Sequence, residues 1–140
     1  MKTPFQVQRI DHVVFRVADL TRSIDFYRNV LGCEVARQRE HLGLVHLRAG
    51  ASMIDLVSVD GTLGSRGGAA AGKDARNVDH LCLRIEPFNE HDLVAHLHRH
   101  GVVPAGSAGI NFGAEGDGPS LYFADPDGNT IELKGPSVAA

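Results

Sequence analysis

Two short runs of the chain alternate polar and apolar side chains in the same order. Residues 11–17 read Asp-His-Val-Val-Phe-Arg-Val, and residues 79–85 read Asp-His-Leu-Cys-Leu-Arg-Ile. A period of two is typical of a β-strand, and it puts the His and the Arg of each run on one face and only apolar side chains on the other. We therefore expect two equivalent strands, each with its apolar face packed against another element.

A helical pattern follows each of these strands. Apolar residues recur at helical spacing between Asp19 and Gly32, and again between Asn89 and Gly101. Asp19 and Asn89 are suitable N-caps, because their side chains can accept hydrogen bonds from the first helical turn. Gly32 and Gly101 suit the left-handed conformation that often ends a helix. The pattern predicts one helix in each copy.

Strand-like runs separated by glycine or proline turns follow each helix. They cover residues 33–40, 43–49 and 52–59 in the first copy and residues 103–110, 119–124 and 130–134 in the second. Each copy therefore reads βαβββ. We expect an α+β fold in which two such modules form curved mixed sheets around a central site.

The two modules are expected to form one domain. We place the first module at residues 1–59 and the second at residues 78–140. Residues 60–77 are rich in glycine and alanine and have no hydrophobic periodicity, so we interpret them as a linker. Open sheet edges need a partner, which favours a homodimer.

Charge and composition narrow the kind of partner. The net charge is −3 and Lys and Arg form no run, which argues against nucleic-acid binding, because phosphate neutralisation needs clustered cations. No apolar stretch approaches the roughly 20 residues that span a bilayer, and the N-terminus lacks a hydrophobic signal core. Cys33 and Cys82 are the only cysteines, so a disulfide framework is not expected. We expect a cytoplasmic protein that binds a small molecule and no membrane.

A second repeat supplies candidate metal ligands. Asp55 and Glu132 each lie between Ile and Leu on the last strand of their module, while His12 and His80 lie on the first. Each module therefore contributes one imidazole and one carboxylate, a donor set that suits Zn, Ni, Co, Fe or Mn. Packing gives no reason to place this pair at matched positions twice, so the repeat favours a divalent metal site over structural histidines.

Three segments together resemble the vicinal oxygen chelate superfamily. They are residues 11–17, the helix with Ser-Ile-Asp-Phe-Tyr at residues 23–27, and the run Asp-Pro-Asp-Gly-Asn-Thr-Ile-Glu-Leu at residues 125–133. The superfamily includes glyoxalase I, fosfomycin-resistance transferases, extradiol dioxygenases, epimerases and bleomycin-resistance binding proteins. The resemblance covers nearly the whole chain. It implies that the ligands are His12, His80 and Glu132, with Asp55 at the fourth ligand position of glyoxalase I, where Glu is usual.

The resemblance implies a metal-dependent lyase or isomerase of the glyoxalase type. In that chemistry the metal binds two adjacent oxygens of an α-oxo or hemithioacetal substrate and stabilises an enediolate, while a carboxylate moves the proton. Glu132 is the first candidate base. Asp55 is the second catalytic candidate, and because it is one methylene short we expect it to reach the metal only through water.

Substrate contacts and alternative functions remain open. Arg16 and Arg76 match positions that hold a glutathione carboxylate in glyoxalase I-like enzymes, although Arg16 can also be a strand arginine paired with an acid. Residues 105–118 contain no Lys or Arg, which argues against a full glutathione clamp or a phosphonate site. The alternatives are a sequestering protein of the bleomycin-resistance type and a metal-dependent dioxygenase of the same fold. Most of the other histidines, His46 included, together with Asp11 and Asp79, are interpreted as lying on solvated faces.

Overall fold

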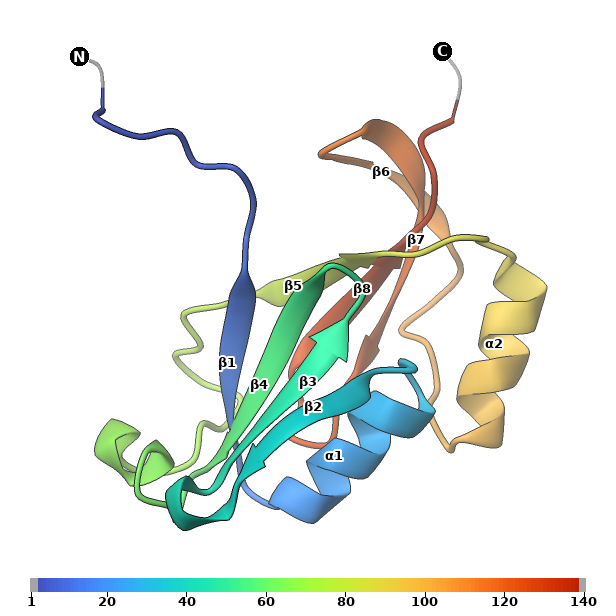
Figure 1. Cartoon of the computed structure of the whole chain (residues 1–140). Helices are drawn as coiled ribbons and strands as arrows, with labels where there is room; N and C mark the ends of the chain where they lie inside the picture. Colours follow the sequence, from blue (N-terminus) through green and yellow to red (C-terminus); the bar gives the residue numbers. More distant parts are fainter. Residues whose placement is uncertain (1–2, 139–140) are drawn as a thin grey trace. The chain divides into compact units, whose positions relative to one another are not determined.

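The computed structural model describes residues 3–138 and divides into two compact units. The units comprise residues 1–70 and residues 71–140, so the boundary falls inside the expected linker. Each unit contains one α-helix and one four-stranded mixed sheet (Figure 1). This is the α+β architecture of two βαβββ modules that the sequence predicts.

The first unit begins with the strand that carries the first His. Its elements are β1 (His12–Val17), α1 (Leu20–Asn29), β2 (Glu34–Arg39), β3 (Leu44–Ala49) and β4 (Ser52–Ser58), with 3₁₀ helices at Glu40–Leu42 and Gly64–Gly67. The strand order is β1-β4-β3-β2. β1 and β4 are parallel, whereas the other neighbours are antiparallel. The first and last strands of the module are therefore adjacent.

The second unit repeats this topology. Its elements are β5 (His80–Arg84), α2 (Glu90–Arg99), β6 (Gly109–Gly113), β7 (Gly116–Ala124) and β8 (Thr130–Lys134). The strand order is β5-β8-β7-β6, and only the pair β5 and β8 is parallel. The sequence repeat thus corresponds to a repeat of element order, strand order and strand direction.

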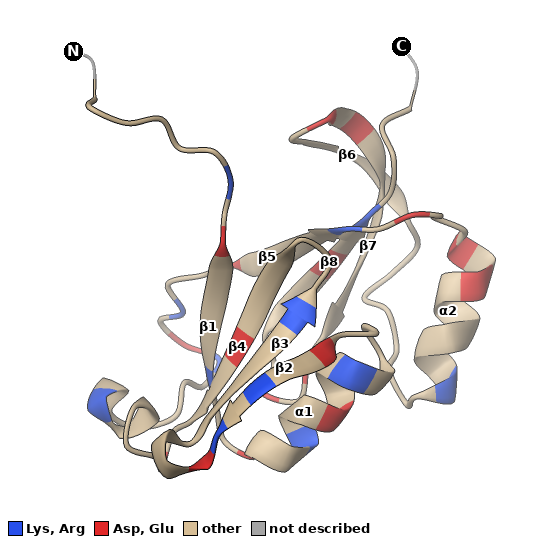
Figure 2. Cartoon of the chain, in the orientation of Figure 1, with Lys and Arg blue, Asp and Glu red and all other residues tan. Residues whose placement is uncertain are grey.

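The helix ends follow the sequence signals. The carboxylate of Asp19 accepts a hydrogen bond from the Arg22 N–H at 3.0 Å, and the Asn89 side chain accepts one from the Asp92 N–H at 3.0 Å. The glycines that follow α1 and α2 have φ of +71° and +73°. Figure 2 shows acidic residues at the start of α2 and a basic residue at its end, the arrangement that the helix dipole favours. Both predicted helices are confirmed.

The strand expected at residues 103–110 is displaced along the chain. β6 begins only at Gly109, and β7 begins at Gly116 rather than at residue 119. Pro104 has no N–H for a strand ladder, and Gly106 has φ of +133°, outside the strand region. The apolar pattern of this segment therefore overestimated its regular structure.

The helix of the first unit covers the apolar face of β1. The rings of Phe15 and Tyr27 lie 6.4 Å apart, and Tyr27 and Val17 have no exposed surface. His12 points from the opposite face of the strand, and its side chain is 48% exposed. Packing therefore uses one face of β1 and leaves the His-bearing face available. None of the helices in residues 3–138 is long and apolar enough to cross a membrane.

A tight turn holds the start of β8. The buried carboxylate of Asp125 accepts hydrogen bonds from the backbone N–H groups of Asp127, at 2.9 Å, and Asn129, at 2.8 Å. Its second oxygen accepts from the Asn129 side chain at 2.9 Å. One side chain therefore fixes the chain direction immediately before the strand that carries Glu132.

We predict that Asp125→Ala lowers the free energy of unfolding by about 2–4 kcal/mol, because three donors lose a buried partner. Urea denaturation measures the change. Asp60→Ala, which removes an exposed aspartate from another turn, is the matched control and should change stability by less than about 0.5 kcal/mol. Equal stability of the two variants would contradict this account of the turn.

Candidate functional site

The same strand register brings a His and an acid together in both units. In the first unit Val14 on β1 lies opposite Asp55 on β4. In the second unit Cys82 on β5 lies opposite Glu132 on β8. In each case the acid faces the residue two positions after the His and so shares a face of the sheet with that His. The fold thus builds two equivalent pairs, the first of Asp and His and the second of Glu and His.

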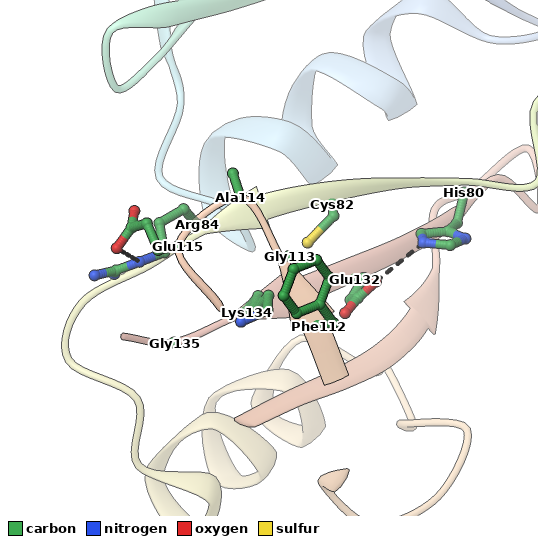
Figure 3. A pocket seen from close by; sticks show the side chains of 10 residues that line it. All are labelled: His80, Cys82, Arg84, Phe112, Gly113, Ala114, Glu115, Glu132, Lys134 and Gly135. Atoms are coloured by element: carbon green, nitrogen blue, oxygen red, sulfur yellow. Dashed lines mark hydrogen bonds and ion pairs between the residues drawn. The ribbon is translucent and has the colours of Figure 1, made fainter. Parts of the chain in front are cut away.

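The distances within the pairs differ in the direction that side-chain length predicts. Nε2 of His80 lies 3.0 Å from Oε1 of Glu132 (Figure 3). Nε2 of His12 lies 4.0 Å from Oδ2 of Asp55. Two donors that each bind one ion at about 2.0–2.2 Å lie about 3 Å apart at a right angle and no more than about 4.4 Å apart at the extreme. The Glu132 pair fits direct ligation well, whereas the Asp55 pair lies near the limit.

An aspartate orients each imidazole. Nδ1 of His12 lies 2.7 Å from Asp11, and Nδ1 of His80 lies 2.7 Å from Asp79. This hydrogen bond is the largest cause that raises the pKa of each His above its usual value. In the tautomer in which Nδ1 donates to the carboxylate, the lone pair of the neutral ring is on Nε2, the nitrogen that faces the acid. Metal-binding histidines in proteins are commonly held in this way.

Sequence reasoning missed the two aspartates. It interpreted Asp11 and Asp79 as solvated residues at the start of strands, and their side chains are indeed 80% and 96% exposed. The available signal was that the residue before the His is Asp in both copies. Exposure alone therefore does not show that a carboxylate lacks a role.

A further side chain lies opposite each acid on the middle strand. His46 on β3 is paired with Asp55, and Tyr122 on β7 is paired with Glu132. Nδ1 of His46 lies 3.0 Å from Oδ1 of Asp55, and the Tyr122 ring meets the His80 ring edge-on with centroids 5.6 Å apart. His46 was expected to be solvated, because its pairing with Asp55 depends on a register that the sequence does not reveal.

The hydrogen bonding of the Asp55 carboxylate is incomplete. The residue is buried, and Oδ1 has no hydrogen bond, because the contact with His46 is short but lacks hydrogen-bond geometry. A buried carboxylate oxygen without a donor is costly, and a nearby cation offsets that cost. In the first unit this oxygen and the imidazole of His12 are donors of the kind that divalent ions bind.

The surroundings of Glu132 favour protonated neighbours. Burial raises the pKa of the Cys82 thiol to about 11, and the negative charge of Glu132 adds to the effect. Burial, followed by the charge of Glu132, raises the pKa of Tyr122. Both groups therefore stay neutral near pH 7. Cys82 in this environment is a poor nucleophile, since the thiolate is the reactive form.

The predicted ligands are found as pairs rather than as a complete set. Among residues 3–138, His, Cys, Asp and Glu side chains form no group of three or more placed to hold an ion. In the first unit His12 and the closer His46 lie near Asp55, and in the second unit His80 lies near Glu132. Ligation of one ion by residues of both modules therefore remains a prediction.

The two arginines proposed from sequence as substrate contacts bind the protein itself. The guanidinium of Arg16 donates to backbone carbonyls of the segment after β4, at 2.8 Å to Gly64, at 3.3 Å to Ala69, and also to Gly68. That of Arg76 donates at 2.9 Å to the Asn129 side chain and at 2.9 Å to the Asp127 carbonyl. Each arginine thus holds a loop in place through hydrogen bonds. Arg16 donates to backbone carbonyls rather than to an acid. Their substrate role stays a prediction.

The second unit contains a cavity of about 280 Å³ beside its His-Glu pair. His80 and Glu132 line one end, and Arg84 and Glu115, paired at 3.3 Å, line the other (Figure 3). Lys134 lies between these ends, on the same strand as Glu132. From the sequence, Arg16 and Arg76 were predicted as cationic substrate contacts, and Lys134 was not.

Comparisons with known proteins identify relatives of similar sequence and fold. The virulence protein STM3117 of Salmonella typhimurium is 29% identical over 127 residues, which are 91% of this chain and 83% of that protein. Its crystal structure matches with a TM-score of 0.76 over 94% of this chain and 99% of that one. A protein from the mobile metagenome of V. pseudocholerae, VPC_CASS1, is 28% identical with a TM-score of 0.75, over 97% of this chain and 100% of that one.

A more distant match shows the shared fold alone. The lactoylglutathione lyase of Agrobacterium tumefaciens is 19% identical, with a TM-score of 0.66 over 95% of this chain and 96% of that one.

The family model of the Glyoxalase/Bleomycin resistance protein/Dioxygenase superfamily matches residues 9–133, a span that includes both His-acid pairs. The chain therefore belongs to the Glyoxalase/Bleomycin resistance protein/Dioxygenase superfamily.

Proposed function

We propose that the protein is a divalent-metal-dependent lyase or isomerase of the glyoxalase type, acting on a small α-oxo or hemithioacetal substrate. The observation that carries the proposal is that the Asp-His-acid arrangement occurs twice, with the same strand register. Family membership supports the fold and the class of chemistry. It does not by itself separate catalysis from binding, because the superfamily also includes resistance proteins.

The residues of the two pairs take distinct roles in this proposal. His12, His80 and Glu132 hold the ion, whether the two pairs come from one chain or from two copies of it. A bound divalent ion would act as a Lewis acid on two adjacent substrate oxygens, which makes the proton on the neighbouring carbon easier to remove. Asp11 and Asp79 keep the imidazole nitrogens aimed at the acids.

The two carboxylates are the candidates for moving the proton. Glu132 is the first candidate base, and its buried position keeps water away from a transferred proton. Asp55 is the second, because its longer distance from the His of its pair leaves it less suited to direct ligation. A proton can then be removed from one carbon and returned to its neighbour by groups that the fold holds in place.

We predict that the protein purified without added metal retains about one divalent ion per chain and that His80→Ala and Glu132→Gln each lose it, because a site with few protein ligands tolerates no deletion. Elemental analysis after dialysis measures the content. His98→Ala and Glu34→Gln remove an exposed His and an exposed Glu elsewhere and should retain the ion. A metal-free wild type would favour a sequestering protein, and unchanged content in both site variants would exclude this site.

Removing the aspartate that orients an imidazole should weaken the site without abolishing it. We expect Asp79→Ala and Asp11→Ala each to lower metal affinity by about 10- to 100-fold, because the freed ring loses its fixed tautomer and orientation. Competition with a chelating dye measures the affinity. Asp74→Ala, an exposed aspartate outside the strands, is the control. Affinities of the two variants equal to that of the control would show that these hydrogen bonds do not serve the metal.

Variants of Asp55 test whether its carboxylate is a metal ligand or a base that only faces the ion. We predict that Asp55→Ala retains most of the metal but lowers turnover of the methylglyoxal and glutathione hemithioacetal by about 10²- to 10⁴-fold. Asp55→Glu should bind metal more tightly, since the longer side chain can reach the ion directly. Metal content, affinity and turnover are measured after identical dialysis. If Asp55→Ala emerges metal-free, Asp55 is a direct ligand and this assignment is wrong.

A further inference from the structure

A buried lysine, Lys134, lines the cavity of the second unit. We propose that its ammonium binds a carboxylate of the ligand, so that the natural ligand is a small organic anion lying between Lys134 and the pair of His80 and Glu132. The metal end of this placement rests on the proposed function. The anion site itself depends only on residues of the second unit.

The first observation is that Lys134 is a buried cation without an acidic partner. The residue is 6% exposed, and its one hydrogen bond among the described residues goes from Nζ to the Gly116 carbonyl at 3.0 Å. Within residues 3–138 no carboxylate lies within 4.0 Å of its ammonium, and the acids that line the cavity are engaged elsewhere, Glu115 with Arg84 and Glu132 with His80. A buried charge without a partner is destabilising, and binding of an opposite charge offsets that cost.

Packing does not explain why this position carries a charge. The Lys134 side chain passes over bare glycine backbone, because a Cβ on Gly113 would come within 2.8 Å of its Cε and a Cβ on Gly118 within 2.8 Å of its Nζ. These two glycines leave a channel for an unbranched side chain of this length. Methionine would occupy much of the same channel without burying a charge. Packing therefore leaves the positive charge of the ammonium unexplained, and a bound anion would explain it.

The neighbouring groups define the size of that ligand. Glu132 and Lys134 are two residues apart on β8, so both face the cavity with their Cα atoms about 6.6 Å apart. The volume of about 280 Å³ is small for a ligand site, which suits a molecule of a few carbon atoms. The exposed ring of Phe112 adds an apolar wall for the carbon chain.

The charge balance favours a carboxylate over a phosphonate or phosphate. The other cation of the cavity, Arg84, is paired with Glu115 at 3.3 Å and lies 3.9 Å from Glu86. One ammonium therefore remains for the ligand, and it matches a single negative charge. A dianionic group usually gathers several cationic donors, and arginine is the residue best suited to bind it in two places.

The test uses chelator-treated protein, so that it can be read whether or not the metal proposal holds. The probes are butyrate and butyramide, which share shape and differ in charge, and binding is followed by two-dimensional amide NMR titration. We expect wild type to bind butyrate on the order of tenfold more tightly than butyramide, as a hydrogen-bonded charge pair predicts. Lys134→Met should remove this preference and keep the native spectrum. Lys73→Met, which deletes an exposed lysine, should keep the preference.

Four outcomes would overturn the proposal. They are equal binding of the two probes by wild type or no binding of either, a preference for butyrate that persists in Lys134→Met, and tighter binding of methylphosphonate than of butyrate. The metal proposal is judged separately by metal content, so failure of either idea leaves the other measurable. Should Lys134→Met lose its native spectrum, a wild-type titration in which butyrate shifts no amide of β7 or β8 would also count against the anion site.

Discussion

The position of each acid beside its His depends on one constraint, the register of the parallel pairs β1 with β4 and β5 with β8. Side chains alternate across a strand, so a slip of one residue in either pair would turn the acid to the opposite face of the sheet and separate it from its His. The register is specified by packing. Ile54 and Leu56 flank Asp55, Ile131 and Leu133 flank Glu132, and all four aliphatic residues are buried. The hydrophobic core thus fixes the position of two buried acids.

The two units use this common frame differently. The acid is Asp in the first unit and Glu in the second, and the residue across from it is His46 in the first and Tyr122 in the second. Lys134, opposite Arg84 in the second unit, has Val57 as its counterpart, opposite Arg16. The second unit therefore has the shorter distance between its acid and the His of its first strand, and it has a buried cation, whereas the first unit has a buried carboxylate oxygen without a hydrogen bond.

Local signals in the sequence were enough to predict the two βαβββ modules and the two His-acid pairs. The repeated Asp-His runs, the caps at Asp19 and Asn89 and the aliphatic residues around each acid all depend on neighbours within a few positions, and the structure follows them. The roles of His46 and Lys134 could not be predicted, because they depend on cross-strand pairing and on which glycines lie beneath a side chain. Arg16 and Arg76 were predicted as substrate contacts from their family positions. Only the folded structure shows that backbone carbonyls already accept hydrogen bonds from their guanidinium groups.

The central claim is that the repeated register supplies one ion with imidazole nitrogens from both His residues and with carboxylate oxygen. X-ray absorption at the edge of the bound metal tests this most directly, because it counts imidazole groups and separates sulfur from nitrogen and oxygen donors. The account predicts about two imidazoles, with the remaining donors oxygen and no sulfur. A sulfur ligand, or a spectrum with no imidazole, would contradict it.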